Sequence, residues 1–99
     1  MMQGEILLQT DDVLIRIMPL GGFGATPWHT HTNVTDRILT LAGRVAVEFR
    51  DPDEIVVLQH GDFCTVETGR VHRVVNAGDQ PARYLLIQGV GRYDFNATI

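Results

Sequence analysis

Glycine and proline divide the chain into short apolar segments, and none of these segments has a helical repeat. Turn sequences such as Gly21-Gly22 and Asp51-Pro52-Asp53 separate them, and Ala42-Gly43-Arg44 has the length and composition of a tight hairpin. The segments predicted as strands are 13–18, 38–41, 45–49, 55–58, 63–66, 71–75 and 84–90. Many short strands at near-regular spacing favour a β-sandwich or barrel over any helical design.

Size and composition favour one small domain, residues 1–99. With 44% hydrophobic residues among 99, the chain can bury one compact core and has no room for a second. The formal net charge is −4 and the eight basic residues are scattered, so neither nucleic acid nor an anionic membrane is expected as a partner. No apolar run approaches membrane-spanning length, and residues 1–5 do not resemble a leader segment. The lone Cys64 cannot form an intrachain disulfide, which suits the reducing cytoplasm.

Three histidines and one aspartate have the spacing of a metal site. Residues two apart on a strand point to the same face, so His29 and His31 are predicted to project side by side. Asp36 lies five residues further on, and a turn or bulge over residues 32–35 can bring its carboxylate round to the same ion. His72, on a distant strand, supplies a third imidazole. The expected cofactor is one divalent transition metal, and Fe, Mn, Ni, Cu and Zn all suit these ligands.

The same residues lie in two stretches that resemble the two motifs of the cupin family. In the first, His-x-His is followed by four residues, Asp36, six residues and Gly43. The second runs from Gly61 to Asn76, and every spacing in it is met. Three positions depart from the family pattern: Gly24 is one residue too close to His29, Asp36 replaces glutamate, and Glu67 stands where proline is usual. The resemblance implies an all-β fold, a double-stranded β-helix or jelly-roll barrel, of the small single-domain cupin type.

Alternation along the strands predicts which side chains line the barrel interior. If Asp36 points inward, so do Ile38 and Thr40, and an inward His72 brings Val74 with it. Together with Trp28, which directly precedes His29 and is expected near the mouth, they form the predicted substrate pocket. A packing role for Trp28 is the alternative. Asp36 is one methylene shorter than glutamate, so it binds the metal directly, binds through water, or leaves a site of three histidines.

A metal in an apolar barrel suits a small organic molecule that chelates through two oxygens. The leading hypothesis is a metal-dependent dioxygenase, because imidazole ligands suit Fe and Cu and apolar walls exclude water from the reaction. Isomerase, decarboxylase or lyase chemistry needs the same ligands and stays open. A non-catalytic cupin that binds or senses a small ligand is the alternative from another class. Arg16, Arg70 and Arg73 favour an anionic substrate if one of them lines the mouth, whereas the ordinary alternative for each is a solvated surface charge.

Two groups of hydrophobic side chains are expected to be shielded from water by other parts of the protein or by a partner. Leu39 and Leu41 fall on the opposite face from Asp36, where either a second copy of the chain or the protein's own N-terminal strand covers them. Small cupins are commonly dimers, so the resemblance favours a homodimer. Tyr93 and Phe95 follow the last predicted strand, and they are expected to pack on the barrel or on a partner.

Overall fold

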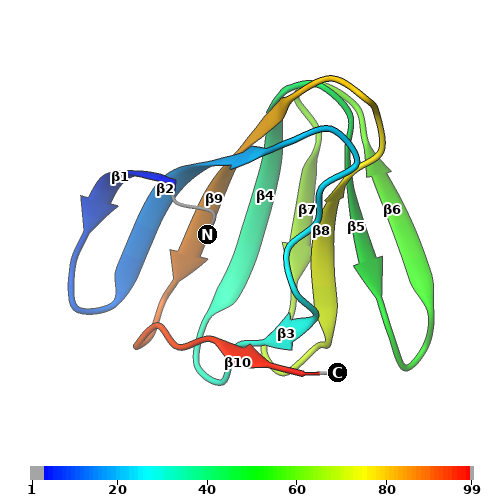
Figure 1. Cartoon of the computed structure of the whole chain (residues 1–99). Coiled ribbons are helices and arrows are strands. Elements are labelled where there is room, and N and C mark those ends of the chain that lie inside the picture. The colour runs from blue at the N-terminus through cyan, green and yellow to red at the C-terminus, as the bar shows by residue number, and fades with distance from the viewer. Residues whose placement is uncertain (1–3, 99) are drawn as a thin grey trace.

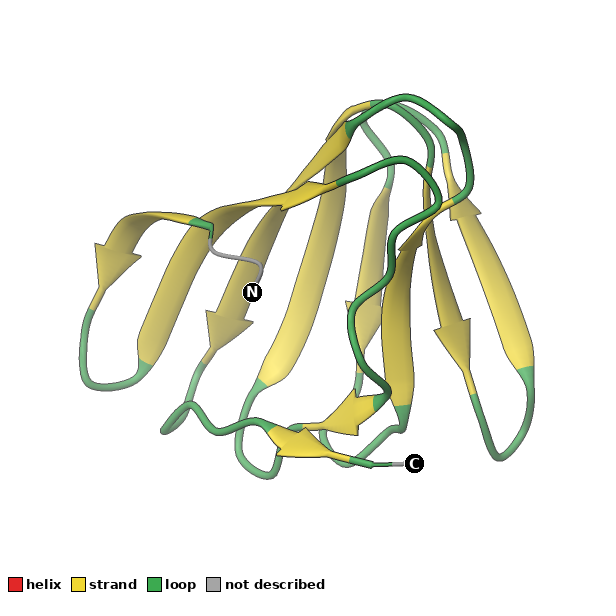
Figure 2. Cartoon of the chain, viewed as in Figure 1, coloured by secondary structure: helices red, strands yellow, loops and turns green. Residues whose placement is uncertain are grey.

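The computed structural model describes residues 4–98 as an all-β protein. Of residues 1–5, which do not resemble a leader segment, the first three lie outside the described residues. Within that range the chain forms strands joined by loops (Figure 2). No helix in this range could cross a membrane. The predicted all-β class is confirmed.

Within residues 4–98, ten strands form two antiparallel sheets that face each other (Figure 1). The first sheet contains, in spatial order, β1 (Glu5–Gln9), β2 (Val13–Leu20), β9 (Ala82–Gly89), β4 (Thr35–Ala42) and β7 (Phe63–Val66). The second contains β10 (Asn96–Ala97), β3 (His29–Thr30), β8 (His72–Asn76), β5 (Val45–Phe49) and β6 (Glu54–Leu58). Apart from β1–β2 and β5–β6, neighbours within each sheet are distant in sequence, as in a jelly-roll barrel.

Alternation along the strands builds the core between the sheets. On β4, Asp36, Ile38 and Thr40 are buried, while Leu39 is half-buried on the other face. β9 alternates in the same way, and Tyr84 is 1% exposed. The core cluster is mainly aliphatic, and it includes Leu20, Ile38, Val45, Val47, Val66, Val74 and Leu86. The inward phase predicted for both motif strands is therefore observed.

The predicted hairpin at residues 42–44 is wrong. β4 and β5, on either side of it, belong to different sheets, because β4 pairs with β9 and β7 while β5 pairs with β8 and β6. The turn carries the chain across the barrel instead. Gly43 has φ +80°, and a Cβ there would lie 2.7 Å from the Cβ of Ala82, which explains glycine at this crossing. The reversal at Asp51-Pro52-Asp53 does form a hairpin, between β5 and β6.

Three strands, β1, β3 and β10, lie outside the seven predicted ranges. A strand is expected at the N-terminus and at His29, where β1 and β3 form, whereas β10 is not anticipated from the sequence. β1 pairs with β2 and extends the first sheet, so it does not cover Leu39 and Leu41. β3 and β10 are two residues each, pair with one another, and lie at the lower end of the barrel in Figure 1. The C-terminal segment thus packs on the barrel. This is the first of the two alternatives predicted for Tyr93 and Phe95, packing on the barrel or on a partner.

Candidate metal centre

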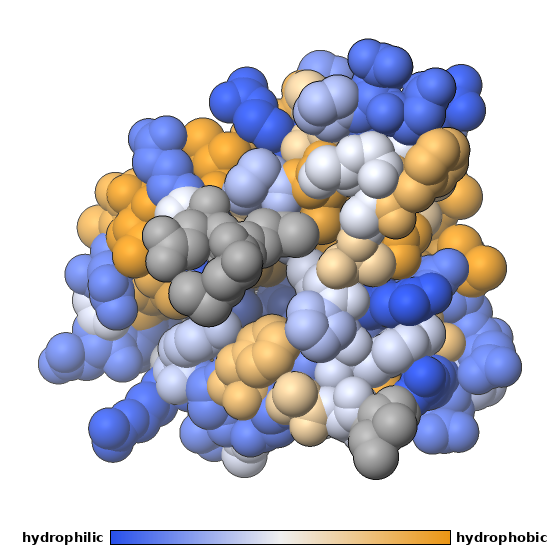
Figure 3. Space-filling model, in the orientation of Figure 1, coloured by the Kyte–Doolittle hydropathy of each residue, from blue (hydrophilic) through white to orange (hydrophobic). Residues whose placement is uncertain are grey.

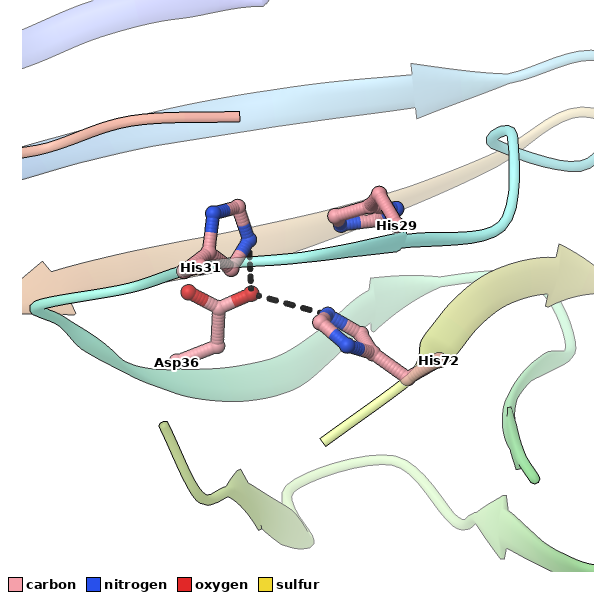
Figure 4. A group of neighbouring side chains, drawn as sticks. All are labelled: His29, His31, Asp36 and His72. Atoms are coloured by element: carbon pink, nitrogen blue, oxygen red, sulfur yellow. Dashed lines mark hydrogen bonds and ion pairs between the residues drawn. The ribbon is translucent and has the colours of Figure 1, made fainter. Parts of the chain in front are cut away.

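Strand pairing brings the four predicted ligands together at the lower end of the barrel. His29 on β3 pairs directly with His72 on β8. His31 follows β3 by one residue, and after a bend the chain enters β4, whose second residue is Asp36. One ligand atom from each residue can be chosen so that all lie within 4.8 Å of one another. Figure 4 shows the four side chains pointing into a common space from three segments.

The carboxylate of Asp36 lies between two imidazoles. Its Oδ2 is 3.1 Å from Nε2 of His31 and 3.2 Å from Nε2 of His72. Two ligands that each bind a metal at about 2.1 Å lie ~3.0 Å apart at a right angle and ~3.4 Å apart at a tetrahedral angle. Both observed distances fall in that interval, so Asp36, although shorter than glutamate, reaches the position of a ligand.

Backbone carbonyls fix the tautomer of each histidine. Nδ1 lies 2.7 Å from the Pro27 carbonyl in His29, 2.6 Å from the Asp94 carbonyl in His31, and 2.8 Å from the Arg70 carbonyl in His72. A carbonyl oxygen can only accept, so Nδ1 carries the hydrogen in all three rings. Each neutral ring therefore keeps its lone pair on Nε2. This is the arrangement in which protein imidazoles bind metals.

The donor set fits a cation. Nε2 of His31 is buried and has no hydrogen-bond partner among the described residues, although it faces Asp36. Lone pairs on nitrogen and oxygen at these separations repel each other unless a proton or a metal ion lies between them. All four residues are at most 5% exposed, so water does not relieve that repulsion. A divalent metal bound by three imidazoles and one carboxylate satisfies every inward lone pair at once.

The pKa shifts of His29, His31 and Asp36 also favour the binding of a cation at this site. Burial lowers the pKa of His29 to about 4, so this ring is neutral near pH 7. Burial opposes the charged forms of Asp36 and His31 as well, but their mutual attraction outweighs it. The pKa of Asp36 is held well below its usual range by His31 and His72, and the pKa of His31 is raised by Asp36. An ionised carboxylate beside imidazoles attracts a cation.

Gln88 is a part of the site that the sequence did not single out. It pairs with Asp36 across β9 and β4, and its Nε2 donates to Asp36 Oδ1 at 3.1 Å. That bond leaves Oδ2 for the imidazoles. Gln88 is 1% exposed, and a polar residue at an inward position of a strand was the signal that could have revealed it.

The C-terminal segment also contributes, through Asp94 and Phe95. The Asp94 carbonyl holds His31, and its carboxylate accepts a hydrogen bond from the Thr32 backbone N–H at 2.8 Å. The Phe95 ring stacks on His29, with centroids 4.4 Å apart and planes 19° apart. No side-chain pattern predicts a main-chain carbonyl, so the Asp94 contact could not be predicted from the sequence.

Two adjoining cavities open beside the ligands. A small one of about 40 Å³ lies against His29, His31 and Asp36. A larger one of about 520 Å³ is lined by Arg16, Met18, Ala25, Thr26, Pro27, Tyr93 and Phe95. The two share five lining residues, so together they lead from the surface to the ligands.

Of the four residues predicted to line the pocket, only Val74 borders the small cavity. Ile38 and Thr40 point inward but lie among the buried residues outside both cavity walls. The position expected for Trp28 is wrong. Its indole lies under the guanidinium groups of Arg50 and Arg73, 4.0 and 4.7 Å from their Cζ atoms, and borders a different depression. Trp28 directly precedes His29, and neighbours on a strand face opposite ways.

Comparison with known proteins places this site in a family. Residues 14–88 match the family model of the cupin domain. The chain is a cupin. A double-stranded β-helix protein from Klebsiella pneumoniae has a similar structure, with a TM-score of 0.85 over 99% of this chain and 84% of that one, at 18% identity. Oxalate oxidase in complex with the substrate analogue glycolate is also similar, with a TM-score of 0.84 over 98% of this cupin and 55% of that chain, at 15% identity.

A curated relative shares more sequence over a shorter span. Auxin-binding protein ABP19b from Prunus persica is 32% identical over 68 residues, which cover 66% of this cupin and 32% of that protein. This cupin therefore spans about a third of the length of that relative. The two structural similarities are below 25% identity, so they describe the fold that this cupin shares with those proteins.

Proposed function

We propose that this cupin binds one divalent transition metal through His29, His31, Asp36 and His72. The observation that carries the proposal is the set of three Nδ1–H groups held by backbone carbonyls, which aims three Nε2 lone pairs toward one carboxylate. The identity of the metal stays open among Fe, Mn, Ni, Cu and Zn, because these ligands suit each of them.

We further propose that the bound metal acts on a small organic molecule that chelates through two oxygens, and that dioxygenase chemistry is the leading reaction. When bound, the metal would supply coordination positions that the protein does not fill, where such a molecule can bind and O₂ can be used. The protein's part is to hold the substrate and exclude water, through Met18, Val74, Leu86 and Phe95 around the small cavity. Oxalate oxidase, which has a similar fold, supports an enzyme acting on an oxygen-rich molecule as the leading proposal.

A metal-dependent isomerase, decarboxylase or lyase uses the same ligands, and a non-catalytic ligand-binding cupin uses the same cavity. The name of the auxin-binding relative supports the binding alternative. Either alternative keeps the small-molecule partner and changes only what happens to it.

One screen separates these functions. Metal content is measured by elemental analysis on protein reconstituted with Fe(II), Mn(II), Ni(II), Cu(II) and Zn(II), and each loaded sample is tested for O₂ uptake with small phenols, diols and keto acids. The expected result is turnover that needs both metal and O₂ and is lost in His72→Ala. Equal turnover without O₂ rejects the dioxygenase. Tight binding of one compound without turnover supports the binding alternative instead.

We also propose that this cupin is a homodimer formed through the outer face of the first sheet. Ile17, Leu85, Leu39 and Phe63 are consecutive neighbours across β2, β9, β4 and β7, and they form an apolar row on that face. Phe63 is 58% exposed. Hydrophobic surface also gathers over β1 and β2 in Figure 3. A second copy that covers this face removes the apolar row from water.

The remaining expectations concern extent and location. Residues 1–99 are proposed as one cupin domain. The cytoplasm is proposed as its compartment, because the buried free thiol of Cys64 suits a reducing environment.

A further inference from the structure

Arg16 is a charged residue on the core face of a strand. On β2 the neighbouring inward positions are the buried Leu14 and Met18, and Arg16 lies between them, partly buried. Arginine is rarely placed inside a barrel unless a partner compensates its charge.

The partners of Arg16 are neutral. Its Nη2 donates to the Tyr93 hydroxyl at 3.1 Å and to Gln88 Oε1 at 3.4 Å, and its Cζ lies 5.3 Å from the centre of the Tyr93 ring. Its Nε is buried without a hydrogen-bond partner among residues 4–98, and no carboxylate in that range forms an ion pair with it. Gln88 links Arg16 to the buried carboxylate of Asp36.

The other two arginines considered for an anionic ligand are occupied elsewhere. Arg73 forms an ion pair of 2.6 Å with Glu48, and Arg70 lies 3.5 Å from Glu54. Neither residue lines the cavities beside the metal centre. Arg16 lines both of them. It is therefore the guanidinium that a ligand in the cavity can contact.

The cavity around Arg16 fits an anion with an apolar body. Its volume of about 520 Å³ is within the usual range for small-molecule sites. Met18, Pro27 and Phe95 supply apolar walls, and the described lining residues of this cavity contain one cation and no carboxylate. A divalent metal and Arg16 outweigh the single negative charge of Asp36, so the local field favours an anion.

We propose that Arg16 anchors the carboxylate of a small organic acid whose apolar part fills the cavity beside the metal centre. A guanidinium presents paired N–H donors that match a carboxylate, and the Tyr93 hydroxyl adjoins them. The inference deepens the proposed function by naming its substrate class, and it rests on that function for the part played by the metal. The Gln88 bridge keeps Arg16 next to Asp36, so an anchored acid lies within the space that leads to the ligands.

The test is calorimetric binding of benzoate, acetate and benzyl alcohol to metal-free and Zn(II)-loaded protein. Wild type is expected to bind benzoate more tightly than acetate, which cannot fill the cavity, and at least tenfold more tightly than benzyl alcohol, which has no charge. Arg16→Gln is expected to weaken benzoate about tenfold to a hundredfold in both forms of the protein. Arg16→Lys keeps the charge without the paired donors, and an intermediate affinity is expected.

Arg44→Gln is the matched control, because it removes the same charge from an exposed turn outside both cavities. Zinc content and thermal melting check that each variant is folded. If Arg16→Gln does not fold, Arg16→Lys carries the test.

Benzoate affinity that is unchanged in Arg16→Gln overturns the proposal, as does benzyl alcohol binding as tightly as benzoate, or no benzoate binding by either form. A protein that retains no metal but binds benzoate through Arg16 refutes the proposed metal function and leaves the anion site standing. A protein that retains metal but binds benzoate independently of Arg16 refutes the anion site and leaves the proposed metal function standing.

Discussion

The C-terminal segment is predicted to hold one metal ligand in place, and truncation after Gly91 tests this. The cut removes the Asp94 carbonyl from His31 Nδ1, the Asp94 carboxylate from the Thr32 N–H, and the hydrogen bond of 2.8 Å from the Thr98 N–H to the Trp28 carbonyl. It also removes the Phe95 ring that stacks on His29. Both β10 and its pairing with β3 are lost.

The magnitude follows from these contacts. Hydrogen bonds contribute about 0.5–1.5 kcal/mol each, and the entropy of ordering a terminal segment offsets part of their sum, so a net loss of about 1–3 kcal/mol is expected. For a domain of this size that lowers Tm by roughly 5–20 °C. Without its backbone acceptor the His31 ring is free to turn and to change tautomer, so metal affinity is expected to fall about tenfold to a hundredfold.

Urea unfolding of metal-free protein measures the first effect, and zinc titration against a competing chelator measures the second. Arg92→Ala is the control within the same segment, because Arg92 is exposed and borders neither cavity. Asp94→Asn retains the acceptor for the Thr32 N–H and is expected to bind zinc like wild type, whereas Asp94→Ala is expected to fall between wild type and the truncated protein. An unchanged urea midpoint together with an unchanged zinc affinity in the truncated protein would refute the reasoning.

Three further outcomes are expected. His31→Ala should lose most bound metal, whereas the size of the loss in Asp36→Ala decides between four ligands and three, as read by elemental analysis. In metal-free protein, the pKa of His29 is about 4 in the folded state and 6.5 in the unfolded chain. Between these pH values the unfolded chain binds one more proton than the folded protein. This ring therefore lowers the free energy of unfolding by up to about 3 kcal/mol as pH falls from 6.5 to 4. Urea midpoints of His29→Gln should lack this component, and equal pH slopes in the two proteins would contradict it. Leu39→Lys should elute as a monomer with unchanged metal content if the outer face of the first sheet forms the dimer, and an unchanged elution volume would reject that interface.

The strands that could be predicted are apolar segments bounded by turn residues. Segments 45–49 and 63–66 were predicted with the bounds that β5 and β7 have. β3 and β10 are two residues each, which is too short to show a period, and they form because β3 pairs with both β10 and β8. The turn at Gly43 was predicted correctly, but its prediction as a hairpin was wrong. Turn residues indicate that the chain reverses, and they do not indicate the sheet in which the next strand pairs.

The candidate metal ligands were predictable for a different reason. His29, His31 and His72 have imidazole side chains, which are common metal ligands, and the spacing of the two motifs predicts that they lie close together. Their orientation depends on the carbonyls of Pro27, Arg70 and Asp94, and every residue has a carbonyl, so the sequence could not mark these three. The error at Trp28 was avoidable, since strand alternation alone places it opposite its neighbour.

Gln88 connects the proposed metal centre with the proposed anion site, and its two neighbours explain why it is an amide. Its Nε2 donates to Asp36 while its Oε1 accepts from Arg16. A carboxylate in its place could not donate to Asp36 and would add a like charge beside it, and a cationic side chain could not accept from Arg16. Only a neutral group with both a donor and an acceptor satisfies both neighbours at this buried position, which is 1% exposed. The Asp36 carboxylate of the proposed metal centre and the Arg16 guanidinium of the proposed anion site are therefore oriented by one side chain, so a change at Gln88 should alter metal affinity and anion affinity together.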